Sequence, residues 1–422
     1  MKLALIGAGQ RGMIYARYAF EKAGDEIVAV VDISEEKRQV AAEEFHIPKE
    51  GVFSDTKDFF KQGKIADAVI LATMDRDHYV QAMEAIDLGY DILLEKPISP
   101  NVRECLEIRD KAREKGVVIV VCHVLRYTRF FSAIKQVIDS GELGKVITIQ
   151  HAENVGNFHM AHSFVRGNWR NSDLSSPIIM QKSCHDMDIL LWLVGSNARK
   201  ISSFGNLSYF KAENAPEGAA DRCLDCPCAD KCRFDGKKAY LPIRGEWPAT
   251  VLTEDQSEEG ILKALREGPY GRCVFKCDNN VCDNQVTDIE FENGVTATFH
   301  LSGLTNKMHR TIKVMCENGD ITGDDAQDYI TVTKYSANAL YEGETRTIPI
   351  NNEEGFHGGG DYRLTMDFLE AMEHKDEAKE SRSSIERSVE SHLMAYAAEQ
   401  SRVTGEVFYM DKLRNGIPKE NN

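Results

Sequence analysis

The first twelve residues place the tightest constraint on what this chain can fold into. An apolar run at residues 3–6 is followed by Gly7, Gly9 and Gly12 at G-x-G-x-x-G spacing, and then by a helical pattern of apolar residues. A strand, a glycine turn and a helix in this order are the context that a dinucleotide-binding fingerprint requires. Gly7 allows a sharp turn, Gly9 leaves room for a pyrophosphate, and Gly12 lets the helix pack closely on the strand.

An acidic residue after the next apolar run indicates which dinucleotide is bound. Residues 27–31 form this run, and Asp32 follows it, twenty residues beyond Gly12. A carboxylate here accepts hydrogen bonds from the adenosine ribose and repels a 2′-phosphate, so the sequence predicts NAD rather than NADP. The amides at the helix start, around Gln10 and Arg11, are expected to face the phosphates. The alternative is a glycine-rich turn that binds nothing.

Alternating strand and helix patterns extend from residue 1 to about residue 122. Strands are expected at residues 2–6, 27–31, 68–72, 91–94 and 117–122, and helices at 11–22, 35–45, 78–88 and 101–115. This alternation is typical of an α/β fold with a doubly wound parallel sheet. Ligands of such sheets bind beyond the carboxyl ends of the strands, where Thr73, His78 and Glu95 stand.

The tripeptide Glu95-Lys96-Pro97 follows one of these strands and supplies a candidate catalytic amine. Pro97 restricts Lys96 to extended conformations, which would hold the amine at the crevice beside the cofactor. A lysine placed there can orient a substrate hydroxyl, or take its proton if burial lowers its pKa. A surface lysine in a strand-to-helix loop is the alternative.

A second polar cluster, MQKSCHDMD at residues 180–188, leads into an apolar helix at 189–194. Lys182, His185 and Asp188 are spaced three residues apart, so on a helix they share a face. His185 has an ordinary pKa suited to proton exchange near neutrality. A histidine that is satisfied within a helix cap is the alternative.

The IGAGQRG turn, Asp32 and Glu95-Lys96-Pro97 together resemble the glucose–fructose oxidoreductase/inositol dehydrogenase family, written Gfo/Idh/MocA. The resemblance covers about residues 1–122. It implies that residues 123–422 form a second α/β domain on a large, open, mostly antiparallel sheet. It also implies a bound NAD, a sugar or polyol substrate, and a homo-oligomer, dimer or tetramer, built through the open sheet face.

The family places an aspartate four residues before the histidine, but Gln181 stands at that position here and Lys182 follows it. This departure leaves the substrate and the reaction open. We expect an NAD-dependent oxidoreductase that acts on a secondary hydroxyl of a sugar, sugar derivative or cyclitol. The alternatives are an NAD-dependent glycosidase that works by transient oxidation and elimination, and a non-catalytic NAD-binding regulator.

These patterns define three sets of candidate site residues. The catalytic candidates are Lys96, His185 and Lys182. The cofactor-binding candidates are Gly7, Gly9, Gln10, Arg11, Gly12, Asp32, Thr73, His78, Glu95 and Lys96. The substrate-binding candidates are Arg126, Tyr127, Trp169, Arg170 and His357. The polar segment 157–175 is expected to be a loop over the site, and a turn at 356–361 is expected to bring His357 to the crevice.

A cysteine-rich stretch at about residues 205–285 indicates a local elaboration. Seven of the eleven cysteines lie between residues 223 and 282. Four of them stand within ten residues: Cys223, Cys226, Cys228 and Cys232. Thiolates this close can coordinate a structural Zn²⁺, with Cys273 or Cys277 completing a tetrahedron. Disulfides, free thiols and an iron–sulfur cluster are the alternatives.

Size and charge exclude several classes of partner. The 422 residues suffice for two domains. A formal net charge of -16 repels phosphate backbones and anionic lipids, which argues against nucleic acid and membrane partners. No apolar run approaches the roughly 20 residues that cross a bilayer, and the N-terminus enters a strand directly. The sequence therefore predicts a cytoplasmic protein.

Overall fold

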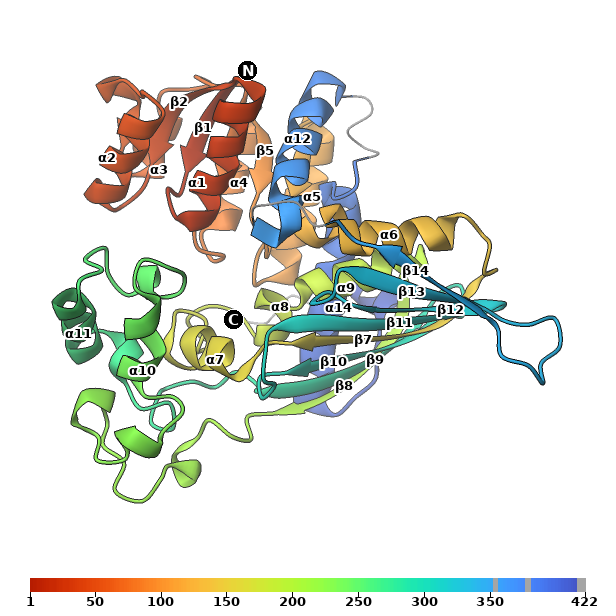
Figure 1. Ribbon diagram of the computed structural model, residues 1–422. Coiled ribbons are helices and arrows are strands. Elements are labelled where there is room, and N and C mark those ends of the chain that lie inside the picture. Colours follow the sequence, from red (N-terminus) through yellow and green to blue (C-terminus); the bar gives the residue numbers. More distant parts are fainter. Residues whose placement is uncertain (352–355, 376–380, 416–422) are drawn as a thin grey trace.

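A computed structural model describes residues 1–351, 356–375 and 381–415, and their arrangement is shown in Figure 1. The N-terminal part is built on a six-stranded parallel sheet with the order β3-β2-β1-β4-β5-β6. Its strands are β1 (Lys2–Ile6), β2 (Glu26–Val31), β3 (Val52–Phe53), β4 (Ala68–Leu71), β5 (Asp91–Leu94) and β6 (Ile119–Val121). This is the strand order of the doubly wound dinucleotide-binding fold, so the predicted fold class is confirmed.

Helices cover this sheet, as the alternating sequence pattern predicts. They are α1 (Gln10–Tyr18), α2 (Glu35–Glu44), α3 (Thr56–Phe60), α4 (His78–Asp87) and α5 (Val102–Lys115). The strands β4 and β5 are buried along their whole length, which explains their uninterrupted apolar sequences. A π-helical turn, Ala19–Ala23, extends α1.

A helix from the far end of the chain completes the N-terminal part. Helix α12 (Gly360–Glu373) lies beside α1, as Figure 1 shows, although more than 300 residues separate the two in the sequence. Its side chains Leu364, Phe368 and Leu369 belong to the same hydrophobic core as Leu3 and Leu5 of β1. The parallel sheet is therefore covered partly by residues from the C-terminal half of the chain.

The second sheet has nine strands in the order β14-β13-β12-β11-β7-β10-β9-β8-β15. They are β7 (Val146–Asn154), β8 (Ala198–Asn206), β9 (Asn284–Phe291), β10 (Thr296–Ser302), β11 (His309–Cys316), β12 (Gly319–Asp324), β13 (Tyr329–Lys334), β14 (Glu344–Pro349) and β15 (Phe408–Tyr409). Among the strand pairs described, β7 and β10 run parallel and the others antiparallel. The predicted mostly antiparallel sheet is confirmed.

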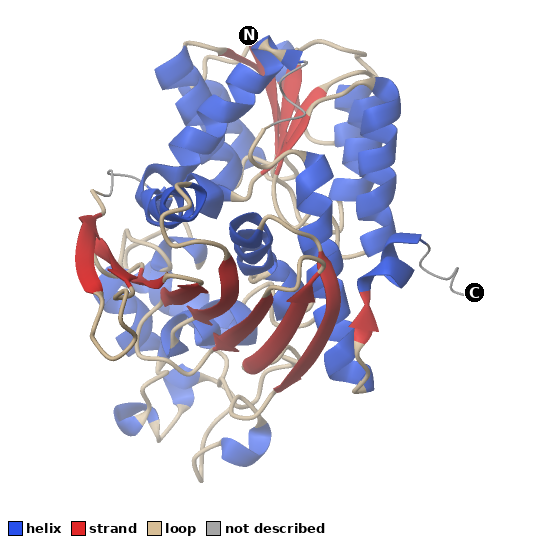
Figure 2. Cartoon of the chain, turned by 90° about the vertical axis from the view of Figure 1, so that its right-hand side faces the viewer, coloured by secondary structure: helices blue, strands red, loops and turns tan. Residues whose placement is uncertain are grey.

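One face of this sheet is packed against helices. Helix α6 (Arg129–Asp139) lies on β13, α9 (Cys184–Val194) on β7, and α14 (Ile385–Thr404) on β8. In β7 the residues Ile149, His151 and Glu153 are buried on this face, while Thr148 and Gln150 point to the other side. Figure 2 shows the curved antiparallel sheet below the parallel one, with helices around both.

The segment 157–175 differs from the expected polar loop. Helix α7 (Asn157–His159) runs into a π-helix, Met160–Arg166, all of whose residues are buried. The ring of His162 stacks on Tyr270 with 4.6 Å between centroids, and its Nδ1 lies 2.9 Å from the Tyr240 hydroxyl. Polar residues enter the interior here because the elaboration between β8 and β9 covers them, which a local sequence pattern does not reveal.

That elaboration contains short helices and a small core of its own. Helices α10 (Gly236–Tyr240) and α11 (Glu258–Glu267) lie at one end of the molecule in Figure 1. Tyr240, Ile261 and Leu265 form the centre of its core. Two further short helices are α8 (Ile178–Gln181) and α15 (Met410–Asn415).

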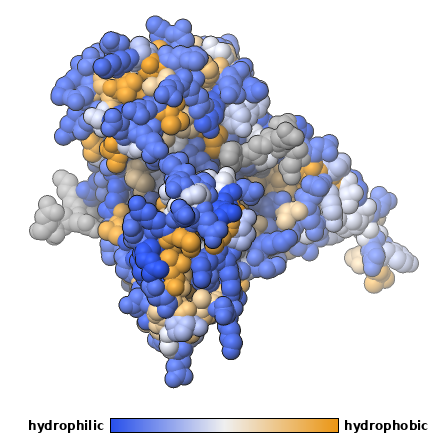
Figure 3. Space-filling model, turned by 60° about the vertical axis from the view of Figure 1, so that its left-hand side comes forward, coloured by the Kyte–Doolittle hydropathy of each residue, from blue (hydrophilic) through white to orange (hydrophobic). Residues whose placement is uncertain are grey.

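The face of the molecule drawn in Figure 3 is mainly hydrophilic, with apolar side chains in separate patches. Within the described part of the chain, none of the helices combines the length and the apolar character that a bilayer crossing requires.

Candidate active site

The glycine turn has the geometry that its spacing predicts. Gly7 has φ +93°, and a Cβ there would lie 2.6 Å from the carbonyl oxygen of Ala72. A Cβ on Gly12 would lie 2.1 Å from the carbonyl oxygen of Gly7 and 2.9 Å from a methyl carbon of Leu5, so only glycine lets α1 pack this closely. By contrast, a Cβ on Gly9 would meet nothing within 4 Å. The turn is therefore tight against the protein at two glycines and open at the third, directly before the first residue of α1, Gln10.

Asp32 lies at the same edge of the sheet and is tied to the turn. Its carboxylate accepts a hydrogen bond from the backbone N–H of Ala8 at 2.9 Å and another from Ser34 at 2.8 Å. These two bonds orient the carboxylate and leave it acceptor capacity for a further ligand. The next side chain, Ile33, is 94% exposed, a feature that the sequence analysis did not single out.

Arg11 is engaged within the protein. Its guanidinium pairs with Glu95, Nε to Oε1 at 2.9 Å, and with the buried Asp361 at the start of α12. The hydroxyl of Tyr15 donates to Glu95 at 2.8 Å. Burial raises the pKa of Glu95, but the charges of Arg11 and Lys96 outweigh burial and hold the pKa below its ordinary value. Arg11 thus joins the glycine turn to β5 and α12, and its guanidinium is committed to carboxylates.

Thr73 and His78 form a second internal link at the strand ends. The Thr73 hydroxyl donates to Gln81 at 2.6 Å. The ring of His78 lies between two backbone carbonyl oxygens, with Nδ1 2.8 Å from Pro97 and Nε2 3.2 Å from Thr73. Burial lowers the pKa of His78, so the ring is neutral. These contacts hold the loop after β4 against the Glu95-Lys96-Pro97 turn.

The two predicted chemical clusters meet where the two sheets approach each other. Lys96 donates from Nζ to the backbone oxygen of Gln181 at 3.0 Å. His185, in the first turn of α9, is buried and lies edge-to-face against His123 with 5.7 Å between centroids. Burial, and then the charge of Lys96, lowers the pKa of His185 well below its ordinary value. Near neutral pH, the ammonium group of Lys96 and the neutral imidazole ring of His185 therefore lie close together.

Lys182 is part of an ionic chain that the sequence analysis missed. Its Nζ lies 3.5 Å from Oε1 of Glu153, which is fully buried on β7. Glu153 also pairs with Arg310 of β11, and Arg310 Nε donates to Asp186 at 2.8 Å. The only sequence signal for this series of ion pairs is the strand alternation, which places Glu153 and Arg310 on the buried face.

His357 lies at the same side of the molecule as Arg11. Its Nδ1 is 2.8 Å from Oδ2 of Asp361, its side chain is 41% exposed, and its charge contributes to the lowered pKa of His185. The expected turn before α12 is present, with φ +50° at His357. The structure thus brings this substrate candidate toward the Lys96 and His185 region.

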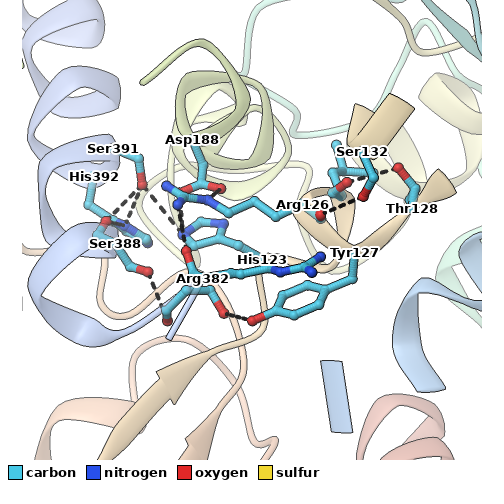
Figure 4. Close-up of polar contacts among 12 residues, drawn as sticks. His123, Arg126, Tyr127, Thr128, Ser132, Asp188, Arg382, Ser388, Ser391 and His392 are labelled. Atoms are coloured by element: carbon cyan, nitrogen blue, oxygen red, sulfur yellow. Dashed lines mark hydrogen bonds and ion pairs between the residues drawn. The ribbon is translucent and has the colours of Figure 1, made fainter. Parts of the chain in front are cut away.

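Arg126 and Tyr127 are buried, and their polar contacts are to other residues of the protein (Figure 4). The Arg126 guanidinium makes a two-pronged contact with Asp188, at 2.6 and 2.7 Å, and donates a further hydrogen bond to the Arg382 backbone. The Tyr127 hydroxyl donates to Asp367 at 2.7 Å. Both side chains are about 2% exposed or less. Arg126 thus joins α9 to the segment just before α14, and Tyr127 joins the same segment to α12. Their role as substrate contacts stays a prediction.

Trp169 and Arg170 contact the π-helix and the elaboration. Arg170 forms an ion pair with Asp278 of the elaboration, at 2.7 and 3.0 Å. Trp169 is half-buried and packs against Phe164. Arg170 fastens the elaboration to the segment after the π-helix, whereas Trp169 packs on the π-helix.

The predicted zinc site is not supported. Across the described ranges, no group of three or more histidine, cysteine, aspartate or glutamate side chains is arranged to hold a metal ion. All eleven cysteines are free thiols. Cys228 donates to the backbone oxygen of Glu217, and Cys223 accepts a hydrogen bond from the buried Arg166 at 3.2 Å. Sequence spacing showed the clustering of the thiols but not their directions.

Comparisons with known proteins agree with this architecture. Residues 1–123 match the family model described as oxidoreductase family, NAD-binding Rossmann fold, and residues 135–410 match the C-terminal alpha/beta domain of the same family. YteT of Bacillus subtilis, named as an oxidoreductase, is 24% identical over 364 residues, which are 82% of each chain. The NAD(+)-dependent scyllo-inositol 2-dehydrogenase of the same organism is 26% identical over 275 residues, covering 65% of this chain and 70% of that one.

Solved structures share the whole fold. Levoglucosan dehydrogenase in complex with NADH and levoglucosan superposes with a TM-score of 0.72 at 16% identity, covering 98% of this chain and all 100% of that chain. An oxidoreductase from Agrobacterium radiobacter in complex with NAD+, L-tartaric acid and magnesium has a TM-score of 0.68 at 14% identity, covering 97% and 98%. The chain therefore belongs to the Gfo/Idh/MocA family of oxidoreductases and carries that family's NAD-binding Rossmann domain at residues 1–123.

Proposed function

We propose that this oxidoreductase binds NAD at the glycine turn and acts on a secondary hydroxyl group of a sugar, sugar derivative or cyclitol. The observation that carries the proposal is the meeting of Lys96 with the 181–185 segment, where its ammonium donates to Gln181 and its charge acts on His185. The names of relatives, which include inositol and levoglucosan dehydrogenases, support the substrate class.

The turn fits a dinucleotide by its shape. The open space at Gly9 lies in front of the first N–H groups of α1, which attract phosphate oxygens. Gln10 and Arg11 would contribute backbone N–H groups there, and Asp32 would accept hydrogen bonds from the ribose. The exposed Ile33 offers an apolar surface for the adenine ring. When bound, NAD supplies the hydride acceptor that the oxidation of an alcohol needs.

The protein side chains then have distinct tasks. The Lys96 ammonium donates a hydrogen bond to the substrate oxygen and stabilises negative charge as it develops there. His185 is neutral because burial and Lys96 lower its pKa, so its ring can accept a hydrogen bond from the same hydroxyl. Lys182 and His357 line the region around Lys96 and His185 on two further sides. Burial of the reacting groups excludes water and strengthens each of these interactions.

The test is a binding and turnover measurement on the purified protein. We expect NADH to bind, and we expect a screen of sugars, glycosides and cyclitols to change the nicotinamide absorbance. Lys96→Ala and His185→Ala should each lower turnover by at least about 100-fold, while the surface control Lys61→Ala leaves turnover unchanged. Release of an aglycone without accumulation of NADH would indicate the glycosidase reaction instead. NADH binding without turnover, together with an effector function that neither substitution changes, would indicate a regulator.

We also propose that the chain forms a homo-oligomer through the open face of the nine-stranded sheet. Thr148, Gln150, Asp288 and Thr298 lie on that face, opposite the helices, and Tyr409 at its edge is 47% exposed. A polar strand face without a helical cover is suited to pairing with a second copy. Light scattering after gel filtration should give a dimer or tetramer, and a monomer at micromolar concentration would contradict this.

We propose a reducing compartment such as the cytoplasm for this protein, because all eleven of its cysteines are free thiols.

A further inference from the structure

A carboxylate without hydrogen bonds lies beneath the candidate active site. Glu153 has no exposed surface, and among the residues described neither of its side-chain oxygens has a hydrogen bond of normal geometry. Two cations pair with it instead: Lys182, with Nζ 3.5 Å from Oε1, and Arg310 on the other oxygen. Burying a carboxylate costs folding free energy unless it is paired with cations such as these.

The strand register explains how Glu153 is held in place. Glu153 and Arg310 are directly opposed residues of the antiparallel strands β7 and β11. Arg310 also pairs with Asp186, whose Oδ1 lies 2.8 Å from Nε2 of His151. The ring of His151 is in turn anchored at Nδ1, 3.2 Å from the Thr311 backbone oxygen. Glu153 therefore sits in a rigid, buried frame.

Lys182 connects this frame with the candidate active site, because it follows Gln181, whose backbone oxygen accepts from Lys96 Nζ. Its side chain is 15% exposed, whereas Glu153 is sealed. The groups that act on Lys182 come from five elements: Glu153 on β7, Arg310 on β11, Asp186 on α9, Lys96 after β5 and His159 on α7. Burial lowers the pKa of Lys182, and Arg310 and Lys96 act in the same direction, while Glu153 and Asp186 oppose them. The amine thus titrates closer to neutrality than an exposed lysine.

We propose that Lys182 takes the proton of the substrate hydroxyl and that Glu153 is the positioning residue that holds the amine and sets its charge state. The inference rests on the proposed function and deepens it. Lys182 directly follows Gln181, the residue that stands where the family resemblance implies an aspartate. The step starts from the fraction of the protein in which Lys182 is unprotonated: the substrate O–H bond breaks, its proton goes to the lone pair on Lys182 Nζ, and the oxygen electrons form the carbonyl as the carbon gives its hydride to NAD. In the reverse direction the ammonium returns the proton.

Two substitutions separate the roles. Lys182→Arg keeps the positive charge and the pairing with Glu153, but a guanidinium does not lose its proton in this range. Glu153→Gln keeps the volume and removes the anion. The matched control is Asp58→Asn, which removes the carboxylate 2.7 Å from Lys61 on the surface. Circular dichroism and thermal unfolding check that each variant folds. If Glu153→Gln does not fold, the test rests on Lys182→Arg alone.

The first readout does not need turnover. Competitive reductive methylation across a pH series, followed by mass spectrometry, reports the fraction of unprotonated amine at each lysine. We expect Lys182 to titrate below the exposed lysines, and Glu153→Gln to raise its reactivity at a fixed pH by about tenfold, the equivalent of one pKa unit. Asp58→Asn should leave Lys182 unchanged. A Lys182 titration that is unaffected by Glu153→Gln would overturn the positioning role.

The second readout is the pH profile of kcat with a substrate from the screen. We expect Lys182→Arg to lower kcat by at least about 100-fold at every pH. Glu153→Gln should shift the acid limb of the profile toward lower pH. Wild-type kcat and pH dependence in Lys182→Arg would show that Lys182 does not carry the proton. If no substrate is turned over while methylation shows the predicted shift, the proposed function fails and the Lys182–Glu153 pair stands.

Discussion

Gly9 and Gly12 belong to one motif, yet their surroundings predict opposite consequences for the same substitution. Gly12→Ala places a methyl group 2.1 Å from a backbone oxygen, so we expect it to lower the free energy of unfolding by about 1–3 kcal/mol and to weaken NADH binding. Gly9→Ala meets no protein atom within 4 Å, and its φ of -76° suits alanine. It should change stability by less than about 0.5 kcal/mol and still weaken NADH binding, because its methyl enters the open space.

Urea unfolding and NADH titration on both variants check this pair. Equal loss of stability in the two variants, or unchanged NADH affinity in Gly9→Ala, would contradict the account of the turn.

Single residues were predictable where a short motif carries them, and less so elsewhere. Lys96 and His185 stand out by residue type after a strand and before a helix, and the structure places them near each other. Arg126 and Tyr127 have equally suitable chemistry, but they are buried against Arg382 and Ser383, just before α14 and 256 residues away. Glu153 and Arg310 look like ordinary strand residues until the register pairs them.

At the scale of elements, the connection between α12 and the glycine turn depends on Asp361. Burial raises the pKa of this carboxyl, but the hydrogen bond from His357 and the charge of Arg11 outweigh burial, so the pKa lies below its ordinary value. Asp361→Asn should lower the free energy of unfolding by about 1–3 kcal/mol at neutral pH and speed hydrogen exchange in α12.

The lowered pKa of Asp361 also predicts how the stability difference between wild type and Asp361→Asn changes with pH. A carboxyl with a lowered native pKa stabilises the fold above its unfolded pKa of about 3.9, and this contribution disappears as the pH falls through the native pKa. The difference between wild type and Asp361→Asn should therefore shrink below about pH 4. Glu370→Gln, on the exposed side of the same helix, is the control and should show no such difference. A pH-independent difference would mean that the charge of Asp361 is not what holds α12.

Long elements were the most predictable part of the fold. The expected strand at 2–6 and helix at 101–115 match β1 and α5 closely. The short strand β3 and helix α3 were missed because two to five residues carry too little periodicity. The π-helix at Met160–Arg166 was missed because its polar residues are buried by the distant elaboration.

For the whole molecule, buried neutral histidines predict acid sensitivity. Burial lowers the pKa of His162 to about 4 and that of His392 to about 3. In His392 the Nε2 atom accepts from the Ile98 N–H at 2.9 Å and Nδ1 faces the Ser388 oxygen, so the native state requires the neutral ring. The unfolded chain takes up protons below about pH 6.5 that the native chain does not, so stability falls from pH 6.5 toward these lower values.

His392→Gln tests this at one site, because glutamine keeps an acceptor and does not titrate. Between about pH 6 and 4, the free energy of unfolding of the wild type should fall more steeply than that of the variant by about 1.4 kcal/mol per pH unit. The exposed His374 provides the control His374→Gln, whose slope should equal that of the wild type. Parallel urea-unfolding curves for wild type and His392→Gln across this range would contradict the prediction.

The central claim is that NAD lies on the glycine turn with its nicotinamide beside Lys96 and His185. A crystal structure of the NAD complex tests it most directly. We predict the pyrophosphate in the open space at Gly9, the ribose on Asp32, and the nicotinamide ring within contact distance of the Lys96 amine and the His185 imidazole. A dinucleotide bound elsewhere, or a nicotinamide directed away from both side chains, would contradict the account.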